Sequence, residues 1–241
     1  MKPYLSVVIP AYNEAKRLPL TLIAIDRHLS RAEFSYEIIV VDNNSTDATP
    51  EVVGRFSHLI NNLRLVEEKT PGKGAAVKKG MLEAKGEIRI FTDADNSTSI
   101  DQFNKMIPYF KEGYDVVIGS RDIEGAKLEP PQSWYKILAG NMGNLFIQAL
   151  VLPGIKDTQC GFKAFTEETA LKIFPLIKIT RWGFDVEILS LAKKMGYRIK
   201  EIPVVWVNDP LSRVSAFAYL QVLWEVVKIR YWLTTNKYNL K

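Results

Sequence analysis

The amino-acid sequence predicts an α/β fold: a mostly parallel β-sheet with helices on both faces, formed by one domain. Short apolar runs of strand length alternate with helical stretches along the first half of the chain. This alternation is typical of a parallel sheet joined by right-handed crossovers. The length also fits, because 241 residues of which 47% are hydrophobic can bury one sizeable core.

Strands in the first half of the chain are predicted from apolar runs bounded by turn-forming residues. They lie at residues 5–9, 36–41, 63–66, 87–92 and 114–118. The first run is continuously apolar until Pro10, which is typical of a strand buried on both faces of a parallel sheet. Helices follow the first three strands, at about 15–30, up to about 56, and after Gly74.

After Arg121 the regular alternation stops. An irregular stretch containing Pro130 and Pro131 precedes a long apolar helix over 134–151. The remaining predicted elements are a loop at 157–161 that enters a strand, helices from about 167 and 181, a last strand over 199–207 and an apolar helix over 216–233. We interpret this half as an elaboration of the same domain.

Polar residues follow each predicted strand. In an open α/β sheet, ligands bind outside the carboxyl ends of the strands. The residues that these ends supply are Tyr12, Glu14, Asp42, Asp93, Asp95 and Arg121. Each has a purely structural alternative, since Asp42 can cap a helix and Gly72 can serve a turn. One shared binding site explains all of them together.

Asp93 and Asp95 form the sharpest of these signals. They stand two residues apart directly after a buried strand, and carboxylate oxygens are the ligands that hard divalent cations prefer. Such a site suits a nucleotide diphosphate. Asp-x-Asp also occurs by chance and at strand-end turns, so its position among the other strand ends carries the prediction.

The net charge indicates which kinds of molecule the protein can bind, and the cysteine content indicates the compartment. The net charge of +5 and a pI near 9.1 suit an anionic partner such as a nucleotide, a nucleic acid or an acidic membrane. We expect no nucleic acid, because the basic residues are not interleaved with aromatic residues in a known binding motif. The single Cys160 fits a reducing compartment.

We expect neither a signal peptide nor a membrane-spanning helix. The stretch over 216–233 is interrupted by Glu225, Lys228 and Arg230. This helix and the one over 134–151 can rest on an anionic leaflet, or they can pack on the core or in a dimer interface. We predict a cytoplasmic protein, peripheral on the inner face of the cell membrane, and leave the oligomeric state open.

Several motifs together resemble the inverting family 2 glycosyltransferases, which have the GT-A fold. They are the segments at 6–14, 41–47, 72–75, 93–95 and 119–121. Two later segments, 157–163 and 182–189, are similar to those of the dolichyl-phosphate β-glucosyltransferases, with the dolichyl-phosphate mannose synthases next. The resemblance covers nearly the whole chain.

The sequence departs from the family pattern at three places. The eukaryotic glucosyltransferases carry an N-terminal anchor that we do not find here. The usual Asp-Asp-Gly after the second strand is Asp42-Asn43-Asn44. The usual Gly-Ser-Lys near the C-terminus is Leu211-Ser212-Arg213, which keeps a cation but loses the glycine.

The resemblance implies a role for each matching residue. Residues 1–125 would form a nucleotide-sugar-binding half and 126–241 an acceptor half. Asp93 and Asp95 would hold Mg²⁺ or Mn²⁺, and Asp42 would accept a hydrogen bond from a uracil ring. The implied donor-binding set is Pro10, Tyr12, Glu14, Asp42, Lys73, Asp93 and Arg213; the implied acceptor-phosphate set is Arg121 and Lys136; and the implied catalytic set is Asp95, Arg121 and Asp157.

The implied reaction transfers glucose from UDP-glucose to dolichyl or polyprenyl phosphate with inversion. An ionised phosphate attacks without a general base, whereas a sugar hydroxyl needs one. A family 2 enzyme acting on a hydroxyl remains an alternative, with Asp157, Asp185 or Glu187 as its base. So do a GDP-mannose-dependent mannosyltransferase, a sugar nucleotidyltransferase and a non-catalytic binding module.

Overall fold

The computed structural model describes residues 2–130, 134–207 and 216–240, without the side chains of 134–139, 141 and 216–218. The strands of its central sheet are β1 (Leu5–Ala11), β2 (Tyr36–Asp42), β3 (Leu63–Glu67), β4 (Ile88–Thr92), β5 (Val116–Ser120), β7 (Phe162–Thr166) and β8 (Ile199–Pro203). Their spatial order is β3-β2-β1-β4-β7-β5-β8. All neighbours are parallel except β7, which is antiparallel to both β4 and β5.

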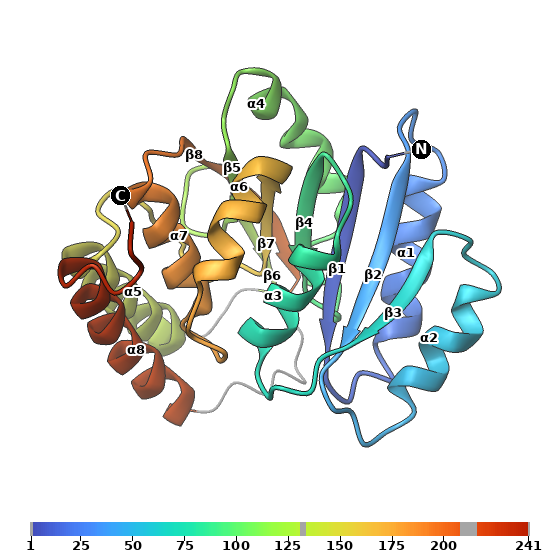
Figure 1. The fold of residues 1–241 in the computed structure, drawn as a ribbon, viewed down its shortest axis with the longest axis horizontal. Coiled ribbons are helices and arrows are strands. Elements are labelled where there is room, and N and C mark those ends of the chain that lie inside the picture. Colours follow the sequence, from blue (N-terminus) through green and yellow to red (C-terminus); the bar gives the residue numbers. More distant parts are fainter. Residues whose placement is uncertain (1, 131–133, 208–215, 241) are drawn as a thin grey trace.

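Helices cover both faces of this sheet (Figure 1). They are α1 (Leu18–Leu29), α2 (Thr49–Ser57), α3 (Lys73–Glu83), α4 (Ile107–Lys111), α5 (Trp134–Leu150), α6 (Glu167–Ile173), α7 (Phe184–Lys194) and α8 (Ala216–Thr234), with 3₁₀ turns η1 (Ile100–Lys105) and η2 (Phe174–Leu176). The predicted α/β fold with a mostly parallel sheet is confirmed.

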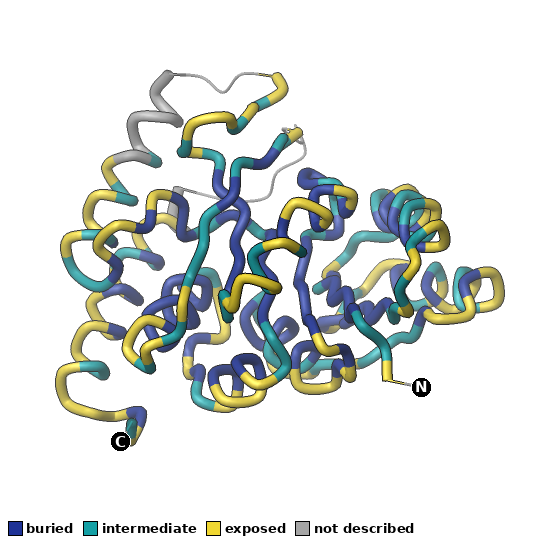
Figure 2. The backbone as a smooth tube through the Cα atoms, turned by 90° about the horizontal axis from the view of Figure 1, so that it is seen from above, coloured by how far each residue is buried: buried dark blue, intermediate teal, exposed yellow. Residues whose placement is uncertain are grey.

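Two apolar cores lie against opposite faces of the sheet, because successive side chains of a strand point to opposite sides. Val8 and Phe91 pack with α3, α6, α7 and α8 in one core. Val7 and Ile90 pack with α1, η1 and part of α2 in the other. Figure 2 shows the central strands as the most deeply buried part of the chain. The continuous apolar runs in the sequence reflect this two-sided burial.

Two predicted strands differ from the structure. β5 begins at Val116 because the Tyr114 N–H donates to the Tyr109 carbonyl and belongs to a turn. The single strand predicted over 199–207 is wrong: β8 pairs with β5, whereas β9 (Val205–Val207) pairs with β6 (Lys127–Glu129) in a separate two-stranded sheet. Pro203 ends β8, since proline cannot donate to a ladder.

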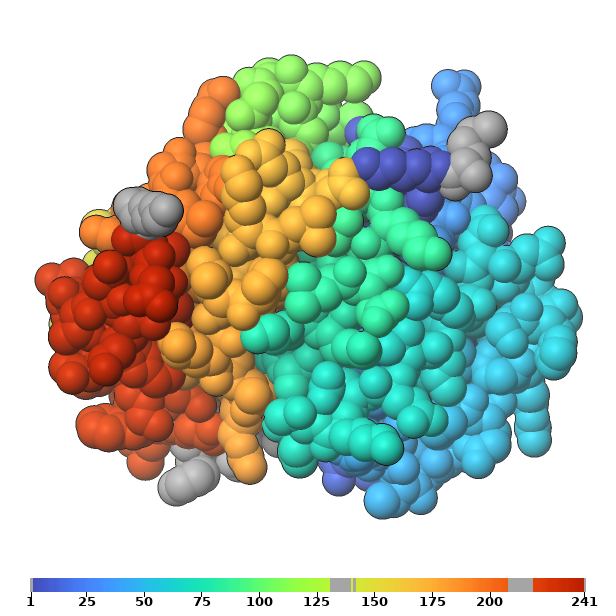
Figure 3. Space-filling view, in the orientation of Figure 1, coloured from blue at the N-terminus to red at the C-terminus, as the bar shows by residue number. Residues whose placement is uncertain are grey.

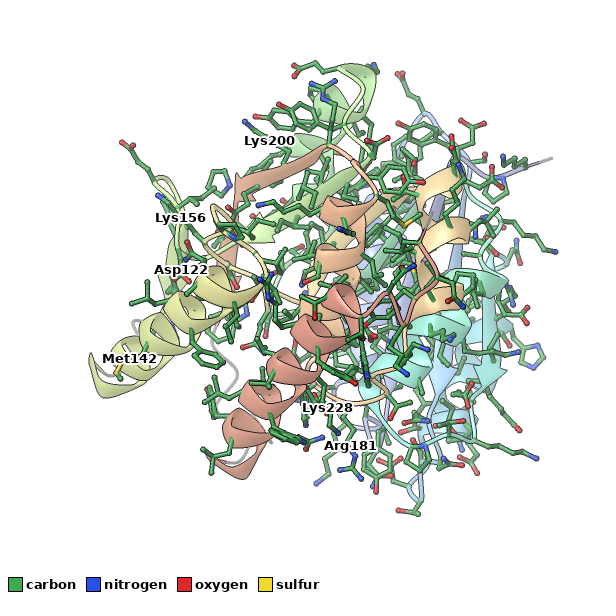
Figure 4. All side chains as sticks on the ribbon, turned by 60° about the vertical axis from the view of Figure 1, so that its left-hand side comes forward. Asp122, Met142, Lys156, Arg181, Lys200 and Lys228 are labelled. Carbon is green, nitrogen blue, oxygen red and sulfur yellow. The ribbon has the colours of Figure 1, made fainter. Side chains whose placement is uncertain are left out.

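The long apolar helices predicted in the second half are confirmed as α5 and α8. They contact each other at one end of the molecule, as Figure 4 shows. Within the ranges that the structure describes, no helix is both long enough and apolar enough to span a membrane.

Candidate active site

The carboxyl ends of β1, β2, β4 and β5 meet at one edge of the sheet, together with the start of the antiparallel β7. Asp93 follows β4, and one of its oxygens lies 2.5 Å from Nζ of Lys73, the first residue of α3. A Cβ on Gly161, just before β7, would lie 2.1 Å from the other oxygen of Asp93. The missing side chain at Gly161 therefore makes room for this carboxylate.

Asp95 lies beside this pair and is only partly exposed. Its Oδ1 accepts the Ser97 N–H at 2.9 Å, and its Oδ2 lies 3.9 Å from Nη1 of Arg17. Arg17 is held in turn by Glu14, whose Oε2 accepts from Nε at 2.6 Å. Burial, with a further contribution from the Asp93 charge, raises the pKa of Asp95. A cation between the two carboxylates would remove this repulsion.

The residues at this edge fit a divalent cation bound together with a diphosphate. Both acidic side chains supply hard oxygen ligands, and the Lys73 ammonium already places positive charge on Asp93. In the described part of the chain, no third acidic, histidine or cysteine side chain completes a metal-binding group. A cation held by Asp93 and Asp95 would therefore need donor or water oxygens for the rest of its shell.

Asp42 ends β2 and is almost fully buried. Its Oδ2 accepts the Ser45 N–H at 3.3 Å, while its Oδ1 has no hydrogen-bond partner among the described residues. A buried carboxylate oxygen without a partner is costly, and an N–H donor from a ligand would satisfy it. Tyr12, after β1, is about half exposed and offers a ring surface at the same edge.

The two asparagines after Asp42 replace the Asp-Gly of the family pattern, and their contacts show how the loop keeps its conformation without the glycine. Asn44 has φ 60°, a left-handed conformation that glycine adopts freely and asparagine tolerates. Asn43 braces the β3–α3 loop: its Nδ2 donates to the carbonyls of Glu68 at 2.7 Å and Thr70 at 2.8 Å, and its Oδ1 accepts the Gly72 N–H at 2.7 Å. The side chains thus keep the loop geometry that precedes Lys73.

Arg121 follows β5 and is fixed by Asp157. Oδ2 of Asp157 accepts from the Arg121 backbone N–H at 2.9 Å and from Nε at 2.7 Å, while Oδ1 accepts from Nη2 at 3.0 Å. The guanidinium carbon also lies 5.5 Å from the ring centre of Trp206 on β9. Burial alone would lower the pKa of Arg121, but the Asp157 carboxylate raises it. The site therefore contains a permanently charged, rigidly placed cation.

Each carboxylate considered as a general base has its own partners. Oδ1 of Asp157 also accepts the N–H groups of Gln159 and Cys160, both at 3.1 Å. Oδ1 of Asp185 accepts from Nζ of Lys163 at 2.5 Å in a fully buried pair. Glu187, also buried, accepts the backbone N–H groups of residues 178 and 179 and a tyrosine hydroxyl.

The structure thus gathers most of the predicted site residues at one edge. Lys73 pairs with Asp93, and Arg17 joins Glu14 to Asp95 in a second group of ion pairs. The Arg121–Asp157 pair follows β5, which is separated from β4 by β7. Pro10 is within β1 and is partly buried. Lys136 lies on α5, but its side chain is outside the description, and Arg213 lies outside the described residues altogether.

Sequence reasoning missed four contributors: Arg17, Asn43, Gly161 and Trp206. Arg17 stands three residues after Glu14, a helical spacing that favours an ion pair. Gly161 stands inside a segment that we singled out, but its contact with Asp93 depends on β7 running antiparallel beside β4. No local signal in the sequence reports that pairing, nor the approach of Trp206 to Arg121.

A parallel sheet with paired carboxylates and fixed cations at its carboxyl edge is an arrangement suited to a phosphorylated ligand. The profile described as glycosyl transferase family 2 matches residues 6–174. The chain therefore belongs to glycosyl transferase family 2 and is a glycosyltransferase.

Individual relatives support this assignment. The chain is 39% identical to the dolichyl-phosphate beta-glucosyltransferase of Dictyostelium discoideum, over 95% of this chain and 74% of that protein. It is 32% identical to the protein of the same name from Homo sapiens, over 98% of this chain and 78% of that one. The predicted resemblance to this group is confirmed.

A solved structure supports the fold. Glucosyl-3-phosphoglycerate synthase from Mycobacterium tuberculosis, in complex with uridine diphosphate, superposes with a TM-score of 0.70 at 20% identity, over 95% of this chain and 80% of that one. The same synthase with Mn²⁺, UDP-glucose and phosphoglyceric acid gives a TM-score of 0.68. This likeness confirms the predicted GT-A fold.

Proposed function

We propose that this protein transfers glucose from UDP-glucose to dolichyl or polyprenyl phosphate with inversion, giving a β-linked lipid-phosphate sugar. The observation that carries the proposal is the distribution of charge at the carboxyl edge of the sheet. Asp93 and Asp95 lie close together after β4, Arg121 is fixed at the end of β5, and the three carboxylates considered as bases all accept hydrogen bonds within the protein. This arrangement suits an acceptor that is already ionised.

The donor half of the proposal concerns residues 1–125. Asp42 would accept a hydrogen bond from the uracil ring through its unpartnered Oδ1, with Tyr12, Pro10 and Glu14 around the base and ribose. Asp93 and Asp95 would hold Mg²⁺ or Mn²⁺ on the diphosphate, and Mn²⁺ and UDP-glucose occur together in the similar mycobacterial synthase. Such a cation neutralises charge on the leaving nucleotide.

In this proposal Lys73 pairs with Asp93 in the free protein and with the diphosphate in the donor complex. Its ammonium neutralises Asp93 before the donor arrives. When a cation and a diphosphate enter, Lys73 exchanges its carboxylate partner for a phosphate oxygen. The exchange keeps every charge paired.

The acceptor half concerns residues 126–241 and the arginine that faces them. Arg121 would bind the lipid phosphate through the hydrogen-bonding capacity that Asp157 leaves unused, with Lys136 as a second cation. Arg213 would contribute from the donor side. The phosphate oxygen would attack the anomeric carbon directly and the bond to the nucleotide would break, so one displacement inverts the α-linked sugar.

The acceptor lipid suggests where the protein works. Exposed apolar side chains gather on α5 and α8: Met142, Leu145, Leu220, Trp224, Val227 and Tyr231. Figure 4 shows Met142 on α5 and Lys228 on the adjacent α8, and Lys228 lies 5.8 Å from the ring centre of Trp224. Aromatic and basic side chains together suit an anionic leaflet. We propose peripheral contact with the inner face of the cell membrane through these two helices.

A donor screen tests the function. Purified protein is mixed with dolichyl phosphate, Mg²⁺ or Mn²⁺, and each of several nucleotide sugars, and lipid-linked sugar is measured. We expect product from UDP-glucose and none from free sugars as acceptors. Product only from GDP-mannose would move the enzyme to the mannosyltransferase alternative. Transfer only to sugar hydroxyls would overturn the phosphate-acceptor proposal.

A further inference from the structure

The loop at residues 178–183 lies between the start of α3 and the C-terminal helix α8. In Figure 3 this part of the chain, coloured amber to orange, separates α3 in green from α8 in red. Trp182 lies in this loop, with its ring centre 5.9 Å from Nζ of Lys73. The loop therefore reaches the lysine that pairs with Asp93.

Contact between this loop and α3 is tight. The Ala75 N–H donates to the Thr180 carbonyl at 3.1 Å. A Cβ on Gly72 would lie 2.1 Å from the oxygen of the same carbonyl, and a Cβ on Gly74 would lie 2.7 Å from the Ile179 oxygen. Only glycine permits this approach, so a shift of the loop must also shift the start of α3.

Two buried carboxylates accept hydrogen bonds from backbone N–H groups of the same loop. Oε2 of Glu225, on α8, accepts the buried Gly183 N–H at 2.7 Å. Glu187 accepts the N–H groups of Lys178 at 3.0 Å and Ile179 at 2.8 Å. The hydroxyl of Tyr238, beyond α8, donates to Glu187 at 2.6 Å.

From these contacts we infer that Glu225 and Tyr238 are positioning residues for the donor site. They fix the 178–183 loop, and the loop fixes the start of α3 and with it the ammonium of Lys73. Neither residue contacts Lys73 or Asp93 itself. The inference rests on the proposed donor site for its functional consequence, whereas the mechanical connection rests on the contacts alone.

The consequence is that the C-terminal helix contributes to nucleotide binding from a distance. Losing the Glu225 carboxylate leaves the buried Gly183 N–H without its acceptor, which a loop corrects by moving. Because the two glycines leave no free space between the loop and α3, the movement displaces Lys73. Tyr238→Phe removes one hydroxyl and leaves Glu187 with its two backbone donors, so its effect is smaller.

The test combines hydrogen exchange with nucleotide binding in Glu225→Ala, Glu225→Gln and Tyr238→Phe. We expect Glu225→Ala to speed exchange at Gly183 and also at the Ala75 amide, and to weaken UDP binding in the presence of Mn²⁺ by about tenfold. Glu225→Gln should restore most of the affinity, since its amide oxygen can accept the Gly183 N–H. Tyr238→Phe should weaken UDP binding by about threefold.

Thr234→Ala serves as the matched control. Thr234 is exposed at the end of α8, and its hydroxyl donates only within the helix, so exchange at Ala75 should stay native. If Glu225→Ala changes exchange at Gly183 but leaves Ala75 and UDP affinity unchanged, the inference is overturned and the proposed function stands. If Ala75 responds but the native protein makes no lipid-linked sugar, the proposed function fails and the mechanical inference stands.

Discussion

Two ion pairs at the carboxyl edge of the sheet differ in how firmly they are held. Lys73–Asp93 is a single contact of 2.5 Å between partly exposed side chains. Arg121–Asp157 is bidentate, with an additional backbone N–H, and Asp157 is almost fully buried. The first pair can exchange partners when charged ligands arrive, whereas the second keeps its geometry. We interpret the first as the adjustable donor side and the second as a preformed anchor for the acceptor phosphate.

The largest expected effect comes from the adjustable side. Asp95→Asn removes a charged ligand from a partly exposed strand end and leaves the core intact. We expect the transfer rate to fall by at least about a hundredfold, because a bound cation supplies several kcal/mol of charge stabilisation. The thermal midpoint should stay near the native value. Native transfer in this variant, with metal still required, would contradict the metal assignment.

The fixed pair should matter most for stability. Asp157→Asn leaves the Arg121 charge unpaired in a mostly buried position, and we expect a loss of about 3 kcal/mol in the free energy of unfolding near pH 7. Burial alone would raise the pKa of Asp157, but Arg121 holds it below the usual value. The stabilisation is therefore present above the unfolded-state pKa of about 3.9 and is lost as the pH falls through the lower folded-state value.

Denaturant titrations at several pH values check this sign. The stability difference between native protein and Asp157→Asn should shrink as the solution becomes strongly acidic. A difference that grows on acidification would mean that the carboxylate is not held in its charged form by Arg121.

Acceptor use should depend on Arg121. We expect Arg121→Ala to raise the KM for polyprenyl phosphate by about tenfold, the usual scale for one charge-assisted contact. Arg121→Lys should recover part of this loss, because an ammonium keeps the charge and loses the planar fork. Lys136→Ala should be milder than Arg121→Ala. Native acceptor kinetics in both alanine variants would favour the hydroxyl-acceptor alternative.

The smallest effect is expected for Lys73→Ala with metal alone. Removing the ammonium frees an oxygen of Asp93 and makes the site more negative, so Mn²⁺ should bind about threefold more tightly in the absence of nucleotide. Calorimetric titration with Mn²⁺ measures this. Weaker Mn²⁺ binding would show that Lys73 does not compete with the cation for Asp93.

The sequence allowed the fold and the gathering of polar residues at one edge of the sheet to be predicted, because both depend on local patterns. Continuous apolar runs mark strands buried on both faces, and the polar residues after them mark the carboxyl edge. The position of Asp93 and Asp95 at this edge could be predicted for that reason. The antiparallel placement of β7 between β4 and β5 could not, since a short apolar segment carries no sign of its direction.

The contacts that depend on β7 and β9 could not be predicted from the sequence for the same reason. Gly161 contacts Asp93, and Asp157 fixes Arg121, only because β7 starts at the edge where β4 and β5 end. Trp206 approaches Arg121 only because 199–207 divides into two strands in different sheets. Such contacts join residues far apart in sequence, so no spacing rule reports them.

The division between an adjustable donor side and a fixed acceptor anchor is tested most directly by titrating UDP, with Mn²⁺ present, into Lys73→Ala and Arg121→Ala. We expect Lys73→Ala to weaken UDP binding by about fivefold and Arg121→Ala to bind UDP with native affinity. Equal weakening of UDP binding in both variants would contradict this division, because Arg121 would then belong to the donor side.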